Sequence, residues 1–259
     1  MLKPINNEQY ITCFNTFCKY SKEYESHKKI RLNTLNSIEH NYSILEVGCG
    51  SGSFTANILE NSIKKPNLYT AFEPLKVFAD QTKSRLRTLD FKTEVINDKF
   101  SYKTNLQRKY DVIILVHSIY SFENDLVETL RNIINHLNEN GKAIIFVQTP
   151  HNSGLMTIYF AEYLEGQTDV SHTLDCWTVE DALRKLNAEY TLYYAEGDLA
   201  VTNASDKEIT DIISFILQAE YYSAPVYLQK RMLDFFHLSE KTWGHVSALT
   251  LALCFLLSK

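Results

Sequence analysis

The sequence predicts an α/β protein built on a doubly wound parallel sheet. Short apolar runs of strand length recur between residues 43 and 148, and helical segments separate them, as in βαβ architecture. The first run enters a glycine-rich loop, the arrangement with which such sheets hold nucleotide-type ligands. A chain of 259 residues, 45% of them hydrophobic, is long enough for one such domain with an insertion.

Two helices are expected ahead of the first strand, within residues 7–39, with a break near residues 21–26. Apolar side chains recur in the first of them at the spacing of one helix face. The aromatic residues of this stretch have two open interpretations: they pack as the core or rim of a helix, or they wall an active site. They are Tyr10, Phe14, Phe17, Tyr20 and Tyr24.

The glycine loop lies in residues 43–54, where the apolar strand runs through Gly48, Gly50 and Gly52 into a helix. Glycine has no Cβ, so backbone N–H groups and the helix N-terminus can approach a ligand closely. In the dinucleotide-binding fingerprint the third glycine would stand at Ser53, but here it comes one residue earlier. The spacing argues against a nicotinamide oxidoreductase and predicts another nucleotide-type cofactor.

Two further strands end in polar residues. Residues 68–72 form a buried strand followed by Glu73 and Pro74, and we expect the proline in the first turn of the next helix. A carboxylate at this strand tip is placed to accept the hydrogens of ribose hydroxyl groups. Residues 92–98 form the third strand and end in Asn97 and Asp98, a pair that is also ordinary turn chemistry.

The run at residues 110–116 is the most apolar, so it is expected to be the central strand. His117 follows it directly, at the strand end where ligands bind in open parallel sheets, and therefore faces the cofactor or the substrate. An amphipathic helix is expected over residues 126–137 with Gly141 as its stop, and residues 142–148 form the fifth strand.

From Thr149 the pattern changes to a polar loop and an aromatic helix, and the last two strands are expected at residues 190–195 and 246–257. Between them, residues 196–245 exceed a normal connection and contain helices near 209–219 and 226–236. Two stretches resemble capping boxes, Thr178–Asp181 and Ser205–Glu208. We expect one domain over residues 1–259, with a helical lid at 1–40 and a helical insertion at 196–245 over the active site.

The composition narrows the functional classes. A formal net charge of -5 argues against a nucleic-acid binder. Five scattered cysteines indicate neither a disulfide framework nor a zinc site, and no two of the eight histidines have metal-ligand spacing, so no metal is expected. No signal peptide or membrane-spanning run stands out. We expect a soluble cytoplasmic protein, a monomer or weak homodimer, with no nucleic-acid or membrane partner and a small-molecule substrate.

The segment Leu45–Gly52, with the sequence LEVGCGSG, resembles motif I of the class I S-adenosylmethionine (SAM) dependent methyltransferases. With Glu73, the Asn97-Asp98 pair and the terminal strand, the resemblance extends over essentially the whole chain. It implies a Rossmann-like seven-stranded sheet, SAM as cofactor and S-adenosyl-L-homocysteine (SAH) as product. It implies that Asp98, or alternatively Asn97, meets the adenine amino group and that Phe100 either stacks on the base or packs beside it. The implied cofactor-binding residues are Glu46, Gly48, Cys49, Gly50, Gly52, Glu73, Pro74, Asn97, Asp98, Phe100, Val116 and His117.

Within that superfamily the chain is similar to histamine N-methyltransferase and its relatives. The similarity rests on short matches at residues 10–14, 21–23, 73–74, 117–120, 153–154 and 244–246. It implies that Glu23 holds the cationic end of an amine substrate. A family glutamine that contacts the imidazole ring corresponds here to His117, and a family asparagine on the last strand corresponds to Thr250. Because two of these three contacts differ, the chemistry is implied more strongly than histamine itself.

The expected reaction is SN2 transfer of a sulfonium methyl group to a nitrogen of a small molecule, an imidazole or an amine. His117 is the candidate catalytic residue, either as proton acceptor or as a hydrogen-bond partner of the acceptor. Two alternatives stay open: a small-molecule O-methyltransferase with His117 as base, and a non-catalytic binding protein of the same fold. The expected substrate-binding residues are Glu23, Tyr24, His117, Tyr120, Phe146, Tyr159, Phe160 and Thr250.

Overall fold

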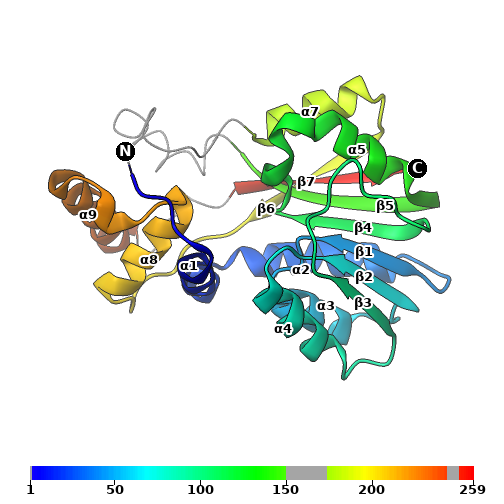
Figure 1. Cartoon of the computed structure of the whole chain (residues 1–259), viewed down its shortest axis with the longest axis horizontal. Helices are drawn as coiled ribbons and strands as arrows, with labels where there is room; N and C mark the ends of the chain where they lie inside the picture. Colours follow the sequence, from blue (N-terminus) through cyan, green and yellow to red (C-terminus); the bar gives the residue numbers. More distant parts are fainter. Residues whose placement is uncertain (1, 150–173, 244–250) are drawn as a thin grey trace. The chain divides into compact units, whose positions relative to one another are not determined.

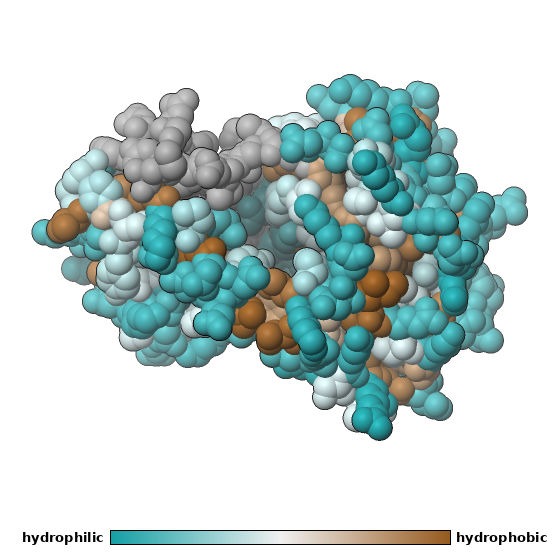
Figure 2. All heavy atoms as spheres, in the orientation of Figure 1, coloured by the Kyte–Doolittle hydropathy of each residue, from teal (hydrophilic) through white to brown (hydrophobic). Residues whose placement is uncertain are grey.

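The computed structural model describes residues 2–149, 174–243 and 251–259. The chain divides into two compact units, which we treat separately. The sheet unit comprises His27–Gln148, Thr173–Ala195 and Ala252–Lys259. The helical unit comprises Met1–Ser26, Thr149–His172 and Glu196–Leu251. Hydrophilic side chains cover most of the face shown in Figure 2.

The sheet unit contains a seven-stranded sheet with the order β3-β2-β1-β4-β5-β7-β6 (Figure 1). β1 to β5 pair in parallel, and β7 runs antiparallel to β5, from Lys142 opposite Ser258 to Gln148 opposite Ala252. The predicted α/β fold with β4 at its centre is therefore confirmed. The strands are β1 (Ser43–Val47), β2 (Leu68–Phe72), β3 (Lys92–Ile96), β4 (Tyr110–Val116), β5 (Leu137–Gln148), β6 (Tyr190–Glu196) and β7 (Leu251–Ser258).

Helices cover both faces of this sheet, because successive strand residues point to opposite sides. On one face Leu45, Ile113 and Ile145 belong to a buried apolar cluster that includes residues of α5 and α7. On the other face Glu46 contacts side chains of α2 and α3. Figure 1 shows α3 beside α4, and α5 beside α7. These helices are α2 (Glu23–Asn36), α3 (Ser53–Asn61), α4 (Lys76–Leu86), α5 (Leu126–Asn135) and α7 (Cys176–Lys185).

The helical unit is built from α1 (Asn7–Tyr20), α8 (Asp206–Leu217), the short helix η2 (Tyr221–Ser223) and α9 (Val226–Trp243). Phe215 of α8 packs against three aromatic rings of α1, at centroid distances of 5.7, 5.6 and 4.8 Å. These rings, which belong to Tyr10, Phe14 and Phe17, therefore favour the packing interpretation. The capping box at Ser205 and Glu208 is confirmed, as are both helices of the expected insertion.

Three local predictions were wrong. α4 begins at Lys76 with Leu75 as its N-cap, so Pro74 precedes the helix instead of occupying its first turn. The backbone N–H of Leu75 is bound by the Glu73 carboxylate, which fixes the chain there. At the start of α7 the N-cap is Asp175, and Thr178 donates its N–H to that side chain at 2.9 Å instead of acting as the cap.

The third error concerns Gly141. α5 ends at Asn135, and Gly141 lies inside β5 instead of stopping the helix. Pairing between β4 and β5 outweighs the local helix-stop signal, because Leu137 already pairs with Tyr110. The register of this pairing shifts between Tyr110 and Val112. A Cβ on Gly141 would lie 2.9 Å from the carbonyl oxygen of Asn138 and 3.1 Å from that of Tyr110, so the backbone leaves little room for a side chain at this position.

Some expectations fall on residues that the structure does not describe. These are most of the polar loop after Thr149, the aromatic helix that follows it, and the start of the last strand at residues 246–250. Among the described helices, none has both the length and the apolar character needed to cross a membrane.

Candidate functional site

The glycine loop connects β1 to α3 and depends on glycine for conformation and for space. Gly48, Gly50 and Gly52 have φ values of 75°, 55° and 71°, in the left-handed region. A Cβ on Gly48 would lie 2.5 Å from Cβ of Ser118, and one on Gly52 would lie 2.6 Å from Oγ1 of Thr82. Gly52 is the N-cap of α3 without a side-chain cap, so the loop presents backbone and a helix N-terminus.

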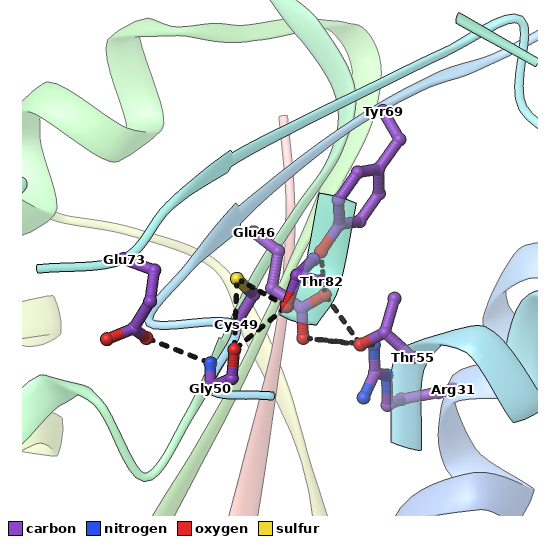
Figure 3. A network of polar contacts seen from close by, with 8 residues as sticks. All are labelled: Arg31, Glu46, Cys49, Gly50, Thr55, Tyr69, Glu73 and Thr82. Carbon is purple, nitrogen blue, oxygen red and sulfur yellow. Dashed lines mark hydrogen bonds and ion pairs between the residues drawn. The ribbon is translucent and has the colours of Figure 1, made fainter. Parts of the chain in front are cut away.

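Glu73 follows the end of β2 and binds this loop directly. Its Oε2 accepts the N–H of Gly50 at 2.9 Å (Figure 3). Its Oε1 accepts the N–H of Leu75 at 2.9 Å. Burial raises the pKa of the Glu73 carboxyl, and the two N–H donors partly oppose that rise. Thr82 donates its hydroxyl to the carbonyl oxygen of Gly50 at 2.8 Å, so the loop is fixed on both sides.

The residues after β3 lie close to this strand tip. Asn97 donates its Nδ2 hydrogens to the carbonyl oxygens of Glu73 and Pro74, both at 2.9 Å. Asp98 is exposed, and its carboxylate accepts the N–H of Lys99. Asn97 therefore organises the tip of β2, while a contact of either side chain with adenine stays a prediction.

Phe100 is 2% exposed and lies in the apolar core. Its ring meets Phe72 and Phe122 edge-on, at centroid distances of 5.4 and 6.2 Å. Its predicted place beside a base finds no support in this packing.

Glu46 and Cys49 are also engaged within the protein. The buried carboxylate of Glu46 interacts with Arg31, Thr55 and Tyr69 (Figure 3). The thiol of Cys49 lies 3.6 Å from Oγ1 of Thr82, and burial raises its pKa to about 12, which keeps it protonated. Val116, the last residue of β4, is half-buried.

His117 stands at the end of β4 with a φ of 52°, which few residues other than glycine adopt. Its N–H donates to the carbonyl oxygen of Phe146 at 3.1 Å. Nδ1 of His117 lies 3.1 Å from the hydroxyl of Tyr120, on the short helix η1 (Ile119–Asp125). That hydroxyl accepts the N–H of Gln148 at 2.8 Å. Unusual backbone geometry of this kind clusters at functional sites, which makes His117 a candidate on structural grounds too.

Sequence reasoning missed His27. This α2 residue is 5% exposed, and its ring centroid lies 4.0 Å from that of Phe146 and 5.3 Å from that of His117. Phe146 is fully buried and its ring packs against that of His27, while its contact with a substrate stays a prediction. One signal could have found His27: it follows Glu23 by four residues, the spacing that puts two side chains on one helix face.

In the sheet unit the structure brings three of the expected acceptor residues together. His117, Tyr120 and Phe146 meet at the ends of β4 and β5. Glu23 and Tyr24 form the first turn of α2, in the helical unit, where Gly197 packs against the backbone of Glu23. Tyr159, Phe160 and Thr250 lie outside the described residues.

A cavity of about 370 Å³ lies in the helical unit, and its lining comes mainly from α1 and α8. None of the expected site residues lines it. Two of its carboxylates are paired with lysines, Glu220 with Lys3 at 2.6 Å and Asp211 with Lys207. We therefore assign this cavity no part in the reaction.

Comparison with known proteins places the chain in a family. The pattern of a family described as “Methyltransferase domain” matches residues 20–195. The chain belongs to this methyltransferase family. Among curated proteins, malonyl-[acyl-carrier protein] O-methyltransferase of Bacillus cereus is 27% identical over 128 residues, covering 47% of this chain and 45% of that protein. The chain thus spans about half the length of the curated relatives that it matches.

Solved structures share the fold at low sequence identity. The N-methyltransferase NodS of Bradyrhizobium japonicum matches with a TM-score of 0.54 and 10% identity, over 92% of this chain and 97% of that one. A mycolic acid cyclopropane synthase in a complex with SAH matches with a TM-score of 0.58 and 14% identity, over 91% and 84%. These matches confirm the fold of the class I methyltransferases and leave the acceptor open.

The glycine loop of this methyltransferase-family chain fits SAM as the cofactor. A Cβ at Gly48 or Gly52 would collide with Ser118 or Thr82, so the loop keeps bare backbone at both positions, and the buried carboxylate of Glu73 lies beside Gly50 at the strand tip. Gly48, Gly50 and Gly52 would hold the cofactor through backbone contacts, and Glu73 would accept hydrogen bonds from ribose hydroxyls. NodS has also been solved in a complex with SAH, with a TM-score of 0.53 to this chain.

Proposed function

We propose that this protein is a SAM-dependent methyltransferase that methylates a nitrogen atom of a small molecule, an imidazole or an amine such as histamine or a histidine-like compound. The observation that carries the proposal is the oriented histidine at the end of β4, on the strand next to the one that enters the glycine loop. Bound SAM supplies a methyl group that its positive sulfur already activates, so the protein's main tasks are alignment and exclusion of water.

We assign to His117 the role of accepting the proton that the methyl acceptor loses. The Tyr120 hydroxyl has a second lone pair besides the one that accepts the N–H of Gln148, so it can accept a hydrogen from Nδ1 of His117. In that tautomer Nε2 is the basic nitrogen, and it takes the proton that the acceptor loses. By resemblance, Glu23 is proposed to hold the cationic end of the substrate. Tyr24 is proposed to form an aromatic wall that fits a planar or cationic substrate.

His27 extends the acceptor site in this proposal. Its ring packs against Phe146 and faces the ring of His117, so two imidazoles stand at the end of β4. Flat rings of this kind suit a planar acceptor, because aromatic groups stack or meet edge-on at such distances.

O-methylation is the second candidate. It is favoured by the similarity to the Bacillus cereus relative, an O-methyltransferase, of which the match covers 45%. In this version Nε2 of His117 removes the proton of a hydroxyl acceptor, and the cofactor site is unchanged.

Titration calorimetry with SAM, followed by incubation of the loaded protein with acceptors, tests both versions. The acceptor set contains histamine, histidine, other imidazoles, simple amines and phenols, and mass spectrometry detects the gain of one methyl group. Methylation of an imidazole or amine supports the N-methyltransferase, and methylation of phenols alone supports the rival. Binding of SAM without transfer to any of these acceptors contradicts the proposed substrate class, and no binding of SAM contradicts the enzymatic proposal.

The variant His117→Asn serves as the test of the proton assignment. Asparagine tolerates the left-handed backbone region, so the loop conformation at φ 52° is retained while the base is lost. We expect SAM binding to persist and the rate of transfer to fall by about a hundredfold. An unchanged rate of methyl transfer would contradict the role of His117 as proton acceptor and would leave it only a role in orienting the substrate.

A further inference from the structure

The carboxylate of Glu46 is the centre of a buried polar network in the sheet unit. Nη2 of Arg31 lies 3.2 Å from its Oε1, Oγ1 of Thr55 lies 2.7 Å from its Oε2, and Oη of Tyr69 donates to Oε2 at 2.7 Å (Figure 3). None of the four residues is more than 3% exposed. The four residues come from α2, β1, α3 and β2, so one carboxylate joins four elements.

Each hydrogen bond of this network has a defined donor and acceptor. Thr55 accepts a hydrogen from Nη2 of Arg31 at 3.0 Å and donates its own hydroxyl to Glu46. Burial raises the pKa of Tyr69 well above its usual value, and the adjacent Glu46 adds to the rise, so the phenol stays a donor. A buried ion pair is tolerated when further hydrogen bonds satisfy its charges, and here two hydroxyls do so for Glu46.

The network holds both ends of the glycine loop. Glu46 stands two residues before Gly48, and Thr55 stands three residues after Gly52. Tyr69 lies on β2, the strand whose Phe72 carbonyl oxygen accepts the N–H of Gly48 at 2.8 Å. Arg31 adds α2, the helix that also carries His27 and Glu23. A change in any of these contacts therefore acts on the positions of the three glycines.

We propose that Glu46, Arg31, Thr55 and Tyr69 are positioning residues that set the conformation of the glycine loop and thereby the affinity for SAM. In this role Glu46 acts through its three partners and does not itself contact the cofactor. The inference rests on the proposed use of SAM and is independent of which acceptor is methylated.

The first test compares two Tyr→Phe variants by SAM calorimetry at 25 °C and by thermal unfolding without SAM. Tyr69→Phe removes one donor from Glu46 and keeps the ring. Tyr42→Phe is the matched control, because Tyr42 is fully buried and its hydroxyl donates to the carbonyl oxygen of Lys64 at 2.8 Å, outside the network. We expect both variants to lose some thermal stability, and only Tyr69→Phe to weaken SAM binding, by about tenfold.

A second pair tests the same idea through α3. Thr55→Val removes the hydroxyl at nearly constant volume, whereas Thr55→Ser keeps it. We expect Thr55→Val to weaken SAM binding by about tenfold and Thr55→Ser to restore most of the affinity. Because Kd is measured on folded protein well below the unfolding midpoint, a loss of stability alone does not change it.

The outcomes separate the two proposals. Wild-type protein that binds no SAM overturns the proposed function and, with it, the role given to the network. Wild-type binding with an unchanged Kd in Tyr69→Phe and Thr55→Val overturns the network alone. Equal weakening of SAM binding in Tyr69→Phe and Tyr42→Phe also overturns the role of the network, because the loss of any buried hydroxyl would then weaken binding.

Discussion

The hydroxyl of Tyr120 holds the imidazole of His117, with its oxygen 3.1 Å from Nδ1. The same oxygen accepts the N–H of Gln148, so the contact links the end of β4 to the end of β5. His117 has a left-handed backbone, and its N–H donates to Phe146. The backbone and the side chain of His117 are therefore fixed by different contacts. A proton acceptor that must meet a small substrate in one orientation needs such fixing.

Tyr120→Phe removes the partner of Nδ1 while the ring remains. We expect kcat to fall by about tenfold, because the imidazole loses its orientation and its preferred tautomer, whereas the Kd for SAM stays unchanged. Steady-state kinetics with a methylated acceptor and calorimetry with SAM measure the two effects. Tyr42→Phe is the control with unchanged kcat, and an equal fall in kcat in that variant would contradict the orienting role of Tyr120.

Gly52→Ala tests the cofactor cradle. The new Cβ meets Thr82 at 2.6 Å and φ is 71°, so we expect a loss of about 1–3 kcal/mol in the free energy of unfolding and no measurable SAM binding. Urea unfolding and calorimetry are the measurements. Ser53→Ala changes the next, exposed residue and should preserve both properties. Retained SAM binding in Gly52→Ala would remove the loop from the cofactor site.

Glu73 gives a pH dependence with a defined sign. Burial raises the pKa of its carboxyl in the folded state, so the folded protein holds this proton more strongly than the unfolded chain. Its contribution to stability is therefore greatest below the ordinary glutamate pKa and is lost as the pH rises through the raised value. We expect the difference in unfolding free energy between wild type and Glu73→Gln to fall over that interval, in urea titrations without SAM.

Glu39→Gln, at an exposed position, is the control for a general effect of removing one carboxylate. Glu73→Gln should also weaken SAM binding by about tenfold, because an amide accepts fewer hydrogen bonds from a diol than a carboxylate does. A pH-independent difference between wild type and Glu73→Gln would be inconsistent with the buried, raised-pKa carboxyl.

Arg31→Met leaves the Glu46 carboxylate buried without its cation. We expect a loss of about 3–5 kcal/mol in the free energy of unfolding, the usual result of removing one partner of a buried pair. The double variant Arg31→Met with Glu46→Leu should regain much of that loss, because no uncompensated charge remains. Urea unfolding of the two single variants and the double variant measures the coupling, and additive losses would show that the pair does not interact.

The cysteines should be unreactive in the folded protein. Burial is the main cause that raises the pKa of Cys13 and Cys176 to about 11 and of Cys18, Cys49 and Cys254 to about 12. Few thiolates are then present at neutral pH, and the thiolate is the reactive form. We expect little alkylation by iodoacetamide at pH 7.5 and complete alkylation of all five thiols after unfolding in urea, measured by mass. Rapid labelling of the native protein would contradict this.

The sequence by itself determined the sheet core and the cofactor loop. The strand at residues 43–47 and its glycines could be predicted because an apolar run of β-branched and aliphatic residues and a need for positive φ are local properties. Glu73 could be placed at the loop for a related reason: parallel strands that neighbour each other bring their carboxyl ends to the same edge.

Only the tertiary structure decided which side chains share a site. His27 is 90 residues from His117 in the chain, and no local spacing relates the two, yet their rings meet at the end of β4. Phe100 packs in the apolar core, and Glu46 binds Arg31, Thr55 and Tyr69; neither set of partners follows from the position of the residue in the sequence. Gly141 was misassigned because pairing with a distant strand outweighs a local helix-stop signal. These outcomes depend on contacts between helices and strands that are distant in the sequence. Residue type and periodicity describe only each helix or strand by itself.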